Sequence, residues 1–366
     1  MSARTVLLTG FPAVRARYVL GQLLASEPFS KLILLVHPER QSEAAELLPR
    51  FGARSGRVEL WPANPASIDF GLDAESYRRL CRDVEVVHAA YTITEGFVGS
   101  SLAEQVNVGS TRELVEFSRS AERLRRVVLY SSVFVSGQRT GRIEEAELEA
   151  EQSFRNPVEK SLALAERTLR RSAAPWIVLR AGHLLGDTQH GKVDYFAGPY
   201  PLIVWVLSAP SNVPLPFPPG SEAPLALTPI EHLARFGVFA ASDAPTNTTL
   251  HVIDPEMPTL RQLLSAVAVR TERKLEPSFN PSSFTRTLLG NSAARWLPQA
   301  ARDVLDVLRS NAEYDTKQVE ALRARGAPAC PPLDGYLDAL ISDVRERIEH
   351  ETLPATRRHE APFLVS

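Results

Sequence analysis

With 366 residues, the chain is long enough for one large or two modest domains with a buried core. Hydrophobic residues make up 44% and charged residues 23% of it, which excludes a disordered or fibrous protein. Lys and Arg number 41 against 43 Asp and Glu. The net charge of -2 leaves no basic excess to neutralise phosphates, so nucleic acid is not expected as a partner.

The chain carries only two cysteines, Cys81 and Cys330. Two are too few for a disulfide framework or a zinc site, so we expect no metal and a reducing, cytoplasmic location. The apolar start of the chain stops at a turn after Gly10 and does not resemble a signal peptide. The most apolar run elsewhere, residues 201–207, is far shorter than the ~20 residues that cross a bilayer, so no membrane span is expected.

The first half of the sequence alternates short β-type runs with helical patterns. Near-continuous apolar strands separated by helices are typical of a parallel sheet that is covered on both faces. We therefore predict an α/β fold of the Rossmann type, with a doubly wound parallel sheet. The six predicted strands lie at residues 6–9, 32–36, 58–61, 84–87, 127–130 and 177–179.

The character of the sequence changes after Gly186. Seven prolines fall between Pro210 and Pro229, a density that predicts loops and edge strands rather than helices or central strands. Helical patterns return further along, at residues 259–270, 295–310, 315–325 and 335–349.

These patterns predict three parts. Residues 1–186 form a nucleotide-binding domain of the Rossmann type, and residues 187–350 form a smaller, mostly helical substrate lobe with segments interleaved with the first domain. Residues 351–366, which carry two prolines and two adjacent arginines, are expected to be a loosely held tail.

A turn suited to a dinucleotide follows the first predicted strand. Its spacing is that of a Gly-x-x-Gly-x-x-Gly turn, which presents a helix N-terminus to a pyrophosphate. Only the first glycine is present, because Ala13 and Ala16 occupy the other two places. A plain strand-to-helix turn without a ligand is the alternative. The candidate cofactor-binding residues of this turn are Gly10, Phe11, Pro12, Ala13 and Val14.

Two side chains beyond the turn are further candidates. Arg40 is the nearest strong cation to the end of the second predicted strand, where a basic residue binds a ribose 2′-phosphate. It favours NADP over NAD, with a solvated loop arginine as the alternative. Asn64 follows the third predicted strand and could hydrogen-bond an adenine amino group or simply form a turn.

Together with several later segments, this turn resembles an extended short-chain dehydrogenase/reductase of the branch related to fatty acyl-CoA and thioester reductases. The resemblance covers nearly the whole chain and implies NAD or NADP as cofactor, with His88, Ala89 and Ala90 forming a turn of the cofactor site. The segments that carry it are Thr9–Pro12, Val87–Ala90, Asn107–Thr111, Tyr130–Gly137, Arg180–Asp187, Gly198–Tyr200, Leu227–Glu231, His251–Pro255 and Cys330–Leu333.

Such enzymes use a serine to hold the substrate carbonyl, a tyrosine to exchange a proton, a lysine beside the tyrosine and an asparagine that orients water. By position, the resemblance matches Ser132 to the serine and Asn107 to the asparagine. Val158 stands in the place of the tyrosine and Leu162 in the place of the lysine. Neither side chain can donate a proton, so the ordinary mechanism lacks two of its four parts and the active site is degenerate.

Lys160 lies between these two positions but is not expected to replace the lysine. Asn156 as the N-cap, Pro157 at the first helical position and Glu159 three residues after the cap predict where the helix begins. In such a helix Lys160 points about 200° away from Val158, toward solvent.

The resemblance also places a pocket above the carboxyl ends of the strands. Many of its expected residues are aromatic, so a small hydrophobic molecule is the expected ligand, and packing between the two lobes is the alternative. His183 and His190 follow the sixth predicted strand, and His183 is a candidate general acid or base for a reaction that is not a reduction. The expected pocket residues are Tyr91, Ser131, Ser132, Phe134, His183, Tyr195, Tyr200 and Trp205.

Five glutamates between residues 144 and 151 lie beside the expected entrance. They could repel anionic substrates or form a mobile cover, but a solvated helix face is the interpretation we prefer.

Two functions remain open. The first is an oxidoreductase that acts on a small hydrophobic carbonyl or alcohol compound with NADP(H) and an unusual proton donor. The second is a non-redox catalyst of the isomerase, cyclase or dehydratase type, or an inactive binding or scaffold protein of a biosynthetic pathway. The resemblance favours the first function, whereas Val158 and Leu162 favour the second. It also permits a homodimer.

Overall fold

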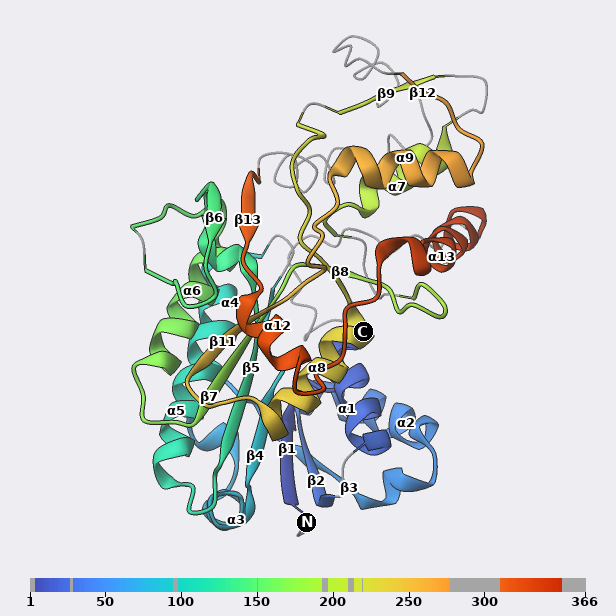
Figure 1. Ribbon diagram of the computed structural model, residues 1–366. Helices are drawn as coiled ribbons and strands as arrows, with labels where there is room; N and C mark the ends of the chain where they lie inside the picture. Colours follow the sequence, from blue (N-terminus) through green and yellow to red (C-terminus); the bar gives the residue numbers. More distant parts are fainter. Residues whose placement is uncertain are drawn as a thin grey trace.

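The computed structural model describes residues 4–26, 29–94, 98–149, 151–192, 197–209, 214–218, 220–276 and 310–350. Within these residues the central element is a seven-stranded parallel sheet with the strand order β11-β7-β5-β4-β1-β2-β3 (Figure 1). The predicted Rossmann-type α/β fold is therefore confirmed. The strands are β1 (Arg4–Thr9), β2 (Phe29–Val36), β3 (Val58–Pro62), β4 (Val86–Ala89), β5 (Arg126–Ser132), β7 (Trp176–Ala181) and β11 (Thr248–Val252).

Helices cover both faces of the sheet, because successive side chains of each strand point to opposite faces and both sets are apolar. Val6 and Leu8 of β1 belong to the core under α1 and α8, whereas Leu7 belongs to the core under α3, α5 and α6 (Figure 1). These helices are α1 (Val14–Ser26), α3 (Ala74–Asp83), α5 (Ser110–Ser120), α6 (Pro157–Arg170) and α8 (Ile230–Asp243), and α2 (Gln41–Leu47) lies beside α1.

The predicted start of α6 is confirmed. The Asn156 side chain accepts a hydrogen bond from the Glu159 backbone N–H (2.9 Å), and Pro157 is the first helical residue. This start sets the rotation of the helix. Val158 and Leu162 are buried, and Lys160 is exposed as expected.

Two elements of the sheet layer come from the second half of the chain and were not among the predicted elements. The helix α8 packs on β5 and β7, and β11 extends the sheet beyond β7 in parallel register, with Thr248 opposite Ile177. Residues 230–252 thus contribute to the same layers as residues 4–181. The proposed division of the chain at residue 186 stays a prediction.

Helices α7, α9 and α13 form a smaller lobe at the carboxyl edge of the sheet, whereas α12 packs on β11 (Figure 1). Three of the four later helical patterns are confirmed by α9 (Leu260–Arg270), α12 (Lys317–Arg323) and α13 (Leu337–Glu349), while 295–309 lies outside the described residues. The apolar run at 201–207 is part of α7 (Tyr200–Ser208). The proline-rich stretch holds short paired strands as expected. The short elements are α4 (Ser100–Ala103), β6 (Gly141–Ile143), β8 (His183–Leu185), β9 (Leu215–Pro216), β10 (Leu227–Pro229), β12 (Leu275–Glu276) and β13 (Ala312–Tyr314).

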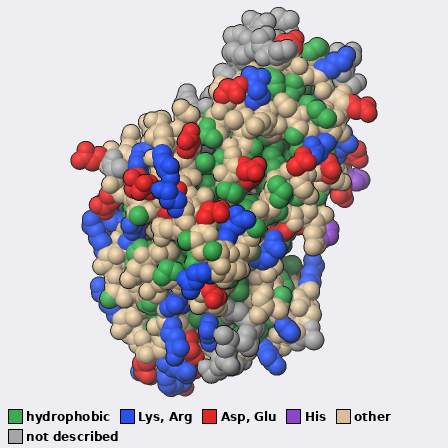
Figure 2. All heavy atoms as spheres, in the orientation of Figure 1, with side chains coloured by type: hydrophobic (Ala, Val, Ile, Leu, Met, Phe, Trp, Pro, Cys, Tyr) green, Lys and Arg blue, Asp and Glu red, His purple; other side chains and the backbone are tan. Residues whose placement is uncertain are grey.

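Basic and acidic side chains are both spread over the face seen in Figure 2, in keeping with the near-zero net charge. Ile68 and Val269 are the large hydrophobic side chains that stand exposed among the described residues, and they lie on separate elements. None of the helices in the described part of the chain is both long and apolar enough to cross a membrane.

The contact between α8 and β5 leaves no room for a side chain at Gly237. A Cβ there would lie 2.2 Å from the Tyr130 hydroxyl oxygen. We expect Gly237→Ala to lower the free energy of unfolding by about 1–3 kcal/mol through overpacking. Denaturant unfolding measures the effect. Gly56→Ala, where an added Cβ meets nothing within 4 Å, is the matched control. Equal stability of the two variants would contradict the tight contact.

Candidate active site

A crevice for a ligand is expected where the strand order reverses, outside the carboxyl ends of β1 and β4. At this point the turn after β1 lies directly against the chain that follows β4. Gly10 has a φ of +90°, and a Cβ there would lie 2.7 Å from the Ala90 carbonyl oxygen. Both the backbone conformation and the close approach require glycine. Thr9 holds the same junction, since its hydroxyl oxygen accepts a hydrogen bond from the Tyr91 N–H (3.1 Å).

The turn residues predicted to bind a cofactor lead into the N-terminus of α1. The Ala13 N–H donates to the Gly10 carbonyl (2.9 Å), and the helix begins at Val14. Phe11 and Pro12 are buried, and the Phe11 ring packs edge-on against Phe51. The first-turn N–H groups of a helix are suited to a diphosphate, so this end of the crevice fits the phosphate part of a dinucleotide.

The polar side chains of the other predicted cofactor residues contact other groups of the protein. The Arg40 guanidinium forms two hydrogen bonds of 2.7 Å with the Glu43 carboxylate, which offsets its charge. The Asn64 side-chain oxygen accepts from the Ala66 N–H (3.0 Å), as in the turn alternative. The His88 imidazole lies in the core under α8, 3.0 Å from the Tyr130 hydroxyl, and burial lowers its pKa to about 3. Its side chain is therefore a packing group.

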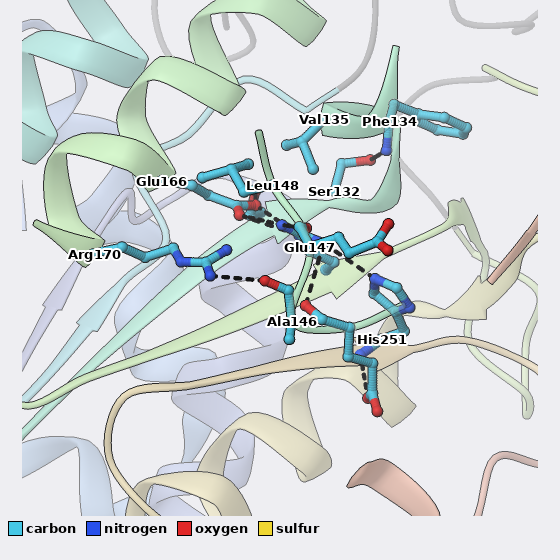
Figure 3. Close-up of polar contacts among 12 residues, drawn as sticks. Ser132, Phe134, Val135, Ala146, Glu147, Leu148, Glu166, Arg170 and His251 are labelled. Carbon is cyan, nitrogen blue, oxygen red and sulfur yellow. Dashed lines mark hydrogen bonds and ion pairs between the residues drawn. The ribbon is translucent and has the colours of Figure 1, made fainter. Parts of the chain in front are cut away.

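Ser132 and Asn107 both lie at this edge of the sheet, with their polar groups already engaged. The Ser132 hydroxyl donates to the Ala181 carbonyl (3.2 Å) and accepts from the Phe134 N–H (3.3 Å) (Figure 3). The Asn107 amide, in the π-helical turn Glu104–Gly109, donates to the Ile93 carbonyl and to the Ser161 hydroxyl at 2.9 Å each. Its oxygen accepts from the Ile93 N–H (2.8 Å). Asn107 thus ties the segment after β4 to α6.

The two replaced catalytic positions lie in an apolar cluster. Val158 and Leu162 are 2% and 1% exposed, and they share this cluster with Tyr91 and Ile93 from the segment after β4. Ala13, at the second glycine position of the turn, packs against the same cluster. These five side chains carry one polar atom, the Tyr91 hydroxyl. Burial raises the Tyr91 pKa to about 12, so it stays neutral. These five side chains offer a nicotinamide ribose no polar group besides that hydroxyl, whereas the ribose needs hydrogen-bond partners.

His183 opens β8, and its ring lies 4.6 Å from that of Phe134. Gly198 is pressed against the imidazole, because a Cβ there would lie 2.4 Å from Nδ1. Burial lowers the His183 pKa to about 3, which keeps the ring neutral. His190 lies instead in an exposed loop, 3.1 Å from the Asp187 carboxylate.

The predicted aromatic pocket is wrong for two of its members. Tyr200 and Trp205 are fully buried in the core of the smaller lobe, and the Tyr200 hydroxyl accepts from the Gly186 N–H (2.8 Å). The packing alternative therefore holds for these two. Tyr195 lies outside the described residues.

A buried polar network that the sequence analysis missed lies below Ser132. Arg180 of β7 pairs with Glu166 of α6 at 2.8 Å, and both are fully buried. Ser131 donates to the same carboxylate at 2.5 Å, so β5, β7 and α6 meet at one group. His251 of β11 lies 3.3 Å from the Arg180 guanidinium, and burial lowers its pKa to about 3.

The glutamate run after β6 takes part in this network. Its interpretation as a helix face is wrong, although Glu144, Glu149 and Glu151 are exposed as expected. Residues 144–149, which we call the strap, contain no helix. Arg180 donates to the Glu147 carbonyl (2.8 Å), and Arg170 donates to the Ala146 carbonyl (2.8 Å). Figure 3 shows strap residues 146–148 between Glu166 and His251.

Glu145 is the buried anchor of the strap. Its carboxylate accepts from the His251 N–H (3.0 Å) and from the Gln318 N–H (2.6 Å). Burial raises its pKa from 4.5 to about 7, an effect that these backbone hydrogen bonds reduce. No local pattern marks this residue, because both donors lie more than 100 positions away.

The fold and the crevice define a domain of the short-chain dehydrogenase/reductase type. The model of the NAD-binding family described as male sterility protein matches residues 8–236. This is more than half of the chain, so the chain belongs to that family. The predicted resemblance is thereby confirmed. No curated protein matches the chain.

Solved structures share the fold at low identity. The terminal R domain from the myxalamid PKS-NRPS biosynthetic pathway is 19% identical with a TM-score of 0.77, over 97% of this chain and 93% of that one. The reductase domain of a non-ribosomal peptide synthetase from Mycobacterium tuberculosis is 18% identical with a TM-score of 0.69, over 94% and 92%. The Bordetella bronchiseptica enzyme WbmF, solved with NAD+, is 13% identical with a TM-score of 0.61, over 96% of each chain.

The raised pKa of Glu145 predicts a pH-dependent stability. Between pH 4.5 and about 7 the folded state binds more protons at this site than the unfolded state, so stability falls as the pH rises through that window. Glu145→Gln reproduces the neutral side chain, and we expect it to flatten this part of the profile. Denaturant unfolding between about pH 5 and about pH 8 measures it. Glu149→Gln, at a mostly exposed strap residue, is the control and should keep the wild-type slope. An unchanged slope in Glu145→Gln would contradict the assignment.

Proposed function

We propose that this chain is a non-redox member of its family, which binds a small apolar molecule at the carboxyl edge of the sheet without reducing it. The observation that carries the proposal is the burial of Val158 and Leu162 in an apolar cluster. Hydride transfer to a carbonyl needs a proton for the developing alkoxide, and losing one acid–base group typically lowers the rate by ~10²–10⁴. The nearby Lys160 is exposed and on another face of α6.

The two retained catalytic candidates support the same conclusion. The Ser132 hydroxyl caps the turn that follows β5, and the Asn107 amide joins the segment after β4 to α6. Both side chains thus make contacts that stabilise the fold, and these contacts are needed even without redox chemistry. Ser132 and Asn107 therefore have a reason to be present in the absence of turnover.

The expected ligand is a small hydrophobic compound with a carbonyl or hydroxyl group. Phe134 and the neutral His183 ring lie together at the start of β8, beside the Ser132 cap. A neutral imidazole offers one N–H donor and one lone pair, which suits the orientation of such a group. In a non-redox reaction of the isomerase, cyclase or dehydratase type, His183 would be the group that contacts the reacting oxygen.

The alternative is a reductase that uses NADP(H) on a small carbonyl compound. Family membership and the helix N-terminus at the crevice favour it. The preference for NADP rests on Arg40, whose charge is offset by Glu43. Titration of NADPH and NADH by calorimetry tests that preference directly.

We expect the purified protein to oxidise NADPH no faster with medium-chain aliphatic aldehydes than without them, because the proton donor is missing. The absorbance of NADPH follows the reaction. Ser132→Ala and the exposed control Ser120→Ala should both give the same background rate. Aldehyde-dependent oxidation that Ser132→Ala abolishes and Ser120→Ala retains would overturn the proposal and establish the reductase.

A further inference from the structure

An arginine that the site description has not used crosses the crevice. Arg15, in the first turn of α1, is only 7% exposed. One guanidinium nitrogen donates to the Thr92 hydroxyl (2.5 Å) and to the Thr92 carbonyl (3.3 Å). The other terminal nitrogen donates to the Thr94 hydroxyl. Both terminal nitrogens of the Arg15 guanidinium are therefore hydrogen-bonded.

The hydrogen bonds of Arg15 join two segments on opposite sides of the crevice. Helix α1 follows β1, and Thr92 and Thr94 follow β4, so the guanidinium bridges the two sides of the point where the strand order reverses. The bridge is fixed from below, since the Thr92 hydroxyl donates to the Tyr130 carbonyl of β5 (2.8 Å). Both threonines are buried.

The apolar cluster lies beside this bridge. Tyr91 and Ile93, which alternate with Thr92 and Thr94 along the chain, pack with Val158 and Leu162, and Ala13 of the turn packs against them. Thr92 and Thr94 therefore contact Arg15, whereas Tyr91 and Ile93 pack with side chains of α6. Residues 91–94 are thus packed between Arg15 and the apolar cluster.

We infer that Arg15 is a gate on the nicotinamide half of the dinucleotide site. A dinucleotide that lies across the reversal point has to pass between α1 and the segment after β4, which requires Arg15 to leave Thr92 and Thr94. The adenosine diphosphate half lies on the side of β1 and β2 and does not require this. The inference rests on the proposed function, because a chain without hydride transfer gains nothing from a bound nicotinamide.

Calorimetric titration with ADP and with NADH tests the gate. In the wild-type protein NADH should bind no more tightly than ADP, because the nicotinamide half adds no contacts. In Arg15→Ala the affinity for NADH should rise by at least about tenfold, since one hydrogen bond to a charged group is worth that much, while the affinity for ADP stays the same. Melting temperatures of both proteins report whether the variant is folded.

A second variant keeps the arginine and removes its two hydroxyl acceptors, while the Thr92 carbonyl remains. Thr92→Val combined with Thr94→Val should also tighten NADH binding, whereas the exposed control Ser120→Ala should leave it unchanged. Three outcomes would overturn the gate: wild-type NADH binding well above that of ADP, weaker NADH binding in Arg15→Ala, or no nucleotide binding by any variant. These are binding results, so they are distinct from the aldehyde-dependent NADPH oxidation that would overturn the proposed function.

Discussion

The buried ion pair between Arg180 and Glu166 is the interaction on which the rest of the carboxyl edge depends. It joins the strand β7 to the helix α6, and Ser131 brings β5 to the same carboxylate. Removing one partner of such a buried pair typically costs about 3–5 kcal/mol, because the other charge is left without compensation. Ser132 and Val158 of the candidate site lie on or next to the elements that this junction joins.

Arg180 of this ion pair also binds the strap, which has no regular secondary structure. Arg180 donates to the Glu147 carbonyl, and the Glu145 carboxylate receives N–H groups from two distant segments. A loop without helix or sheet hydrogen bonds has to satisfy its backbone in some other way when it is buried. Charged side chains take that role here: Arg180 and Arg170 bind strap carbonyls, and the buried Glu145 binds two N–H groups, while Glu144 and Glu149 stay exposed.

The sheet could be predicted from the sequence because buried parallel strands are near-continuous apolar runs. Each of the six predicted runs overlaps a strand, although the run at 84–87 does so only at residues 86 and 87. The seventh strand and α8 were missed because they follow the proline-rich stretch, although the β-branched run at Thr248–Val252 is a strand signal. The outward direction of Lys160 could be predicted because the cap at Asn156 is a local signal. The network of Glu145, Glu166 and Arg180 could not, since its pairing depends on which elements the fold brings together. Arg15 was visible in the turn itself, as a charge among small and apolar residues, but its partners follow another strand.

The contacts between the strap region and residues 312–318 also constrain the order of folding. β6 pairs with β13, and Glu145 accepts from Gln318, which lies 173 positions later in the chain. Contacts at such separation form late, after shorter loops have closed. During synthesis the first six sheet strands emerge well before residues 312–318. The contacts that fix the strap can therefore form on the growing chain only after residues 312–318 have been made.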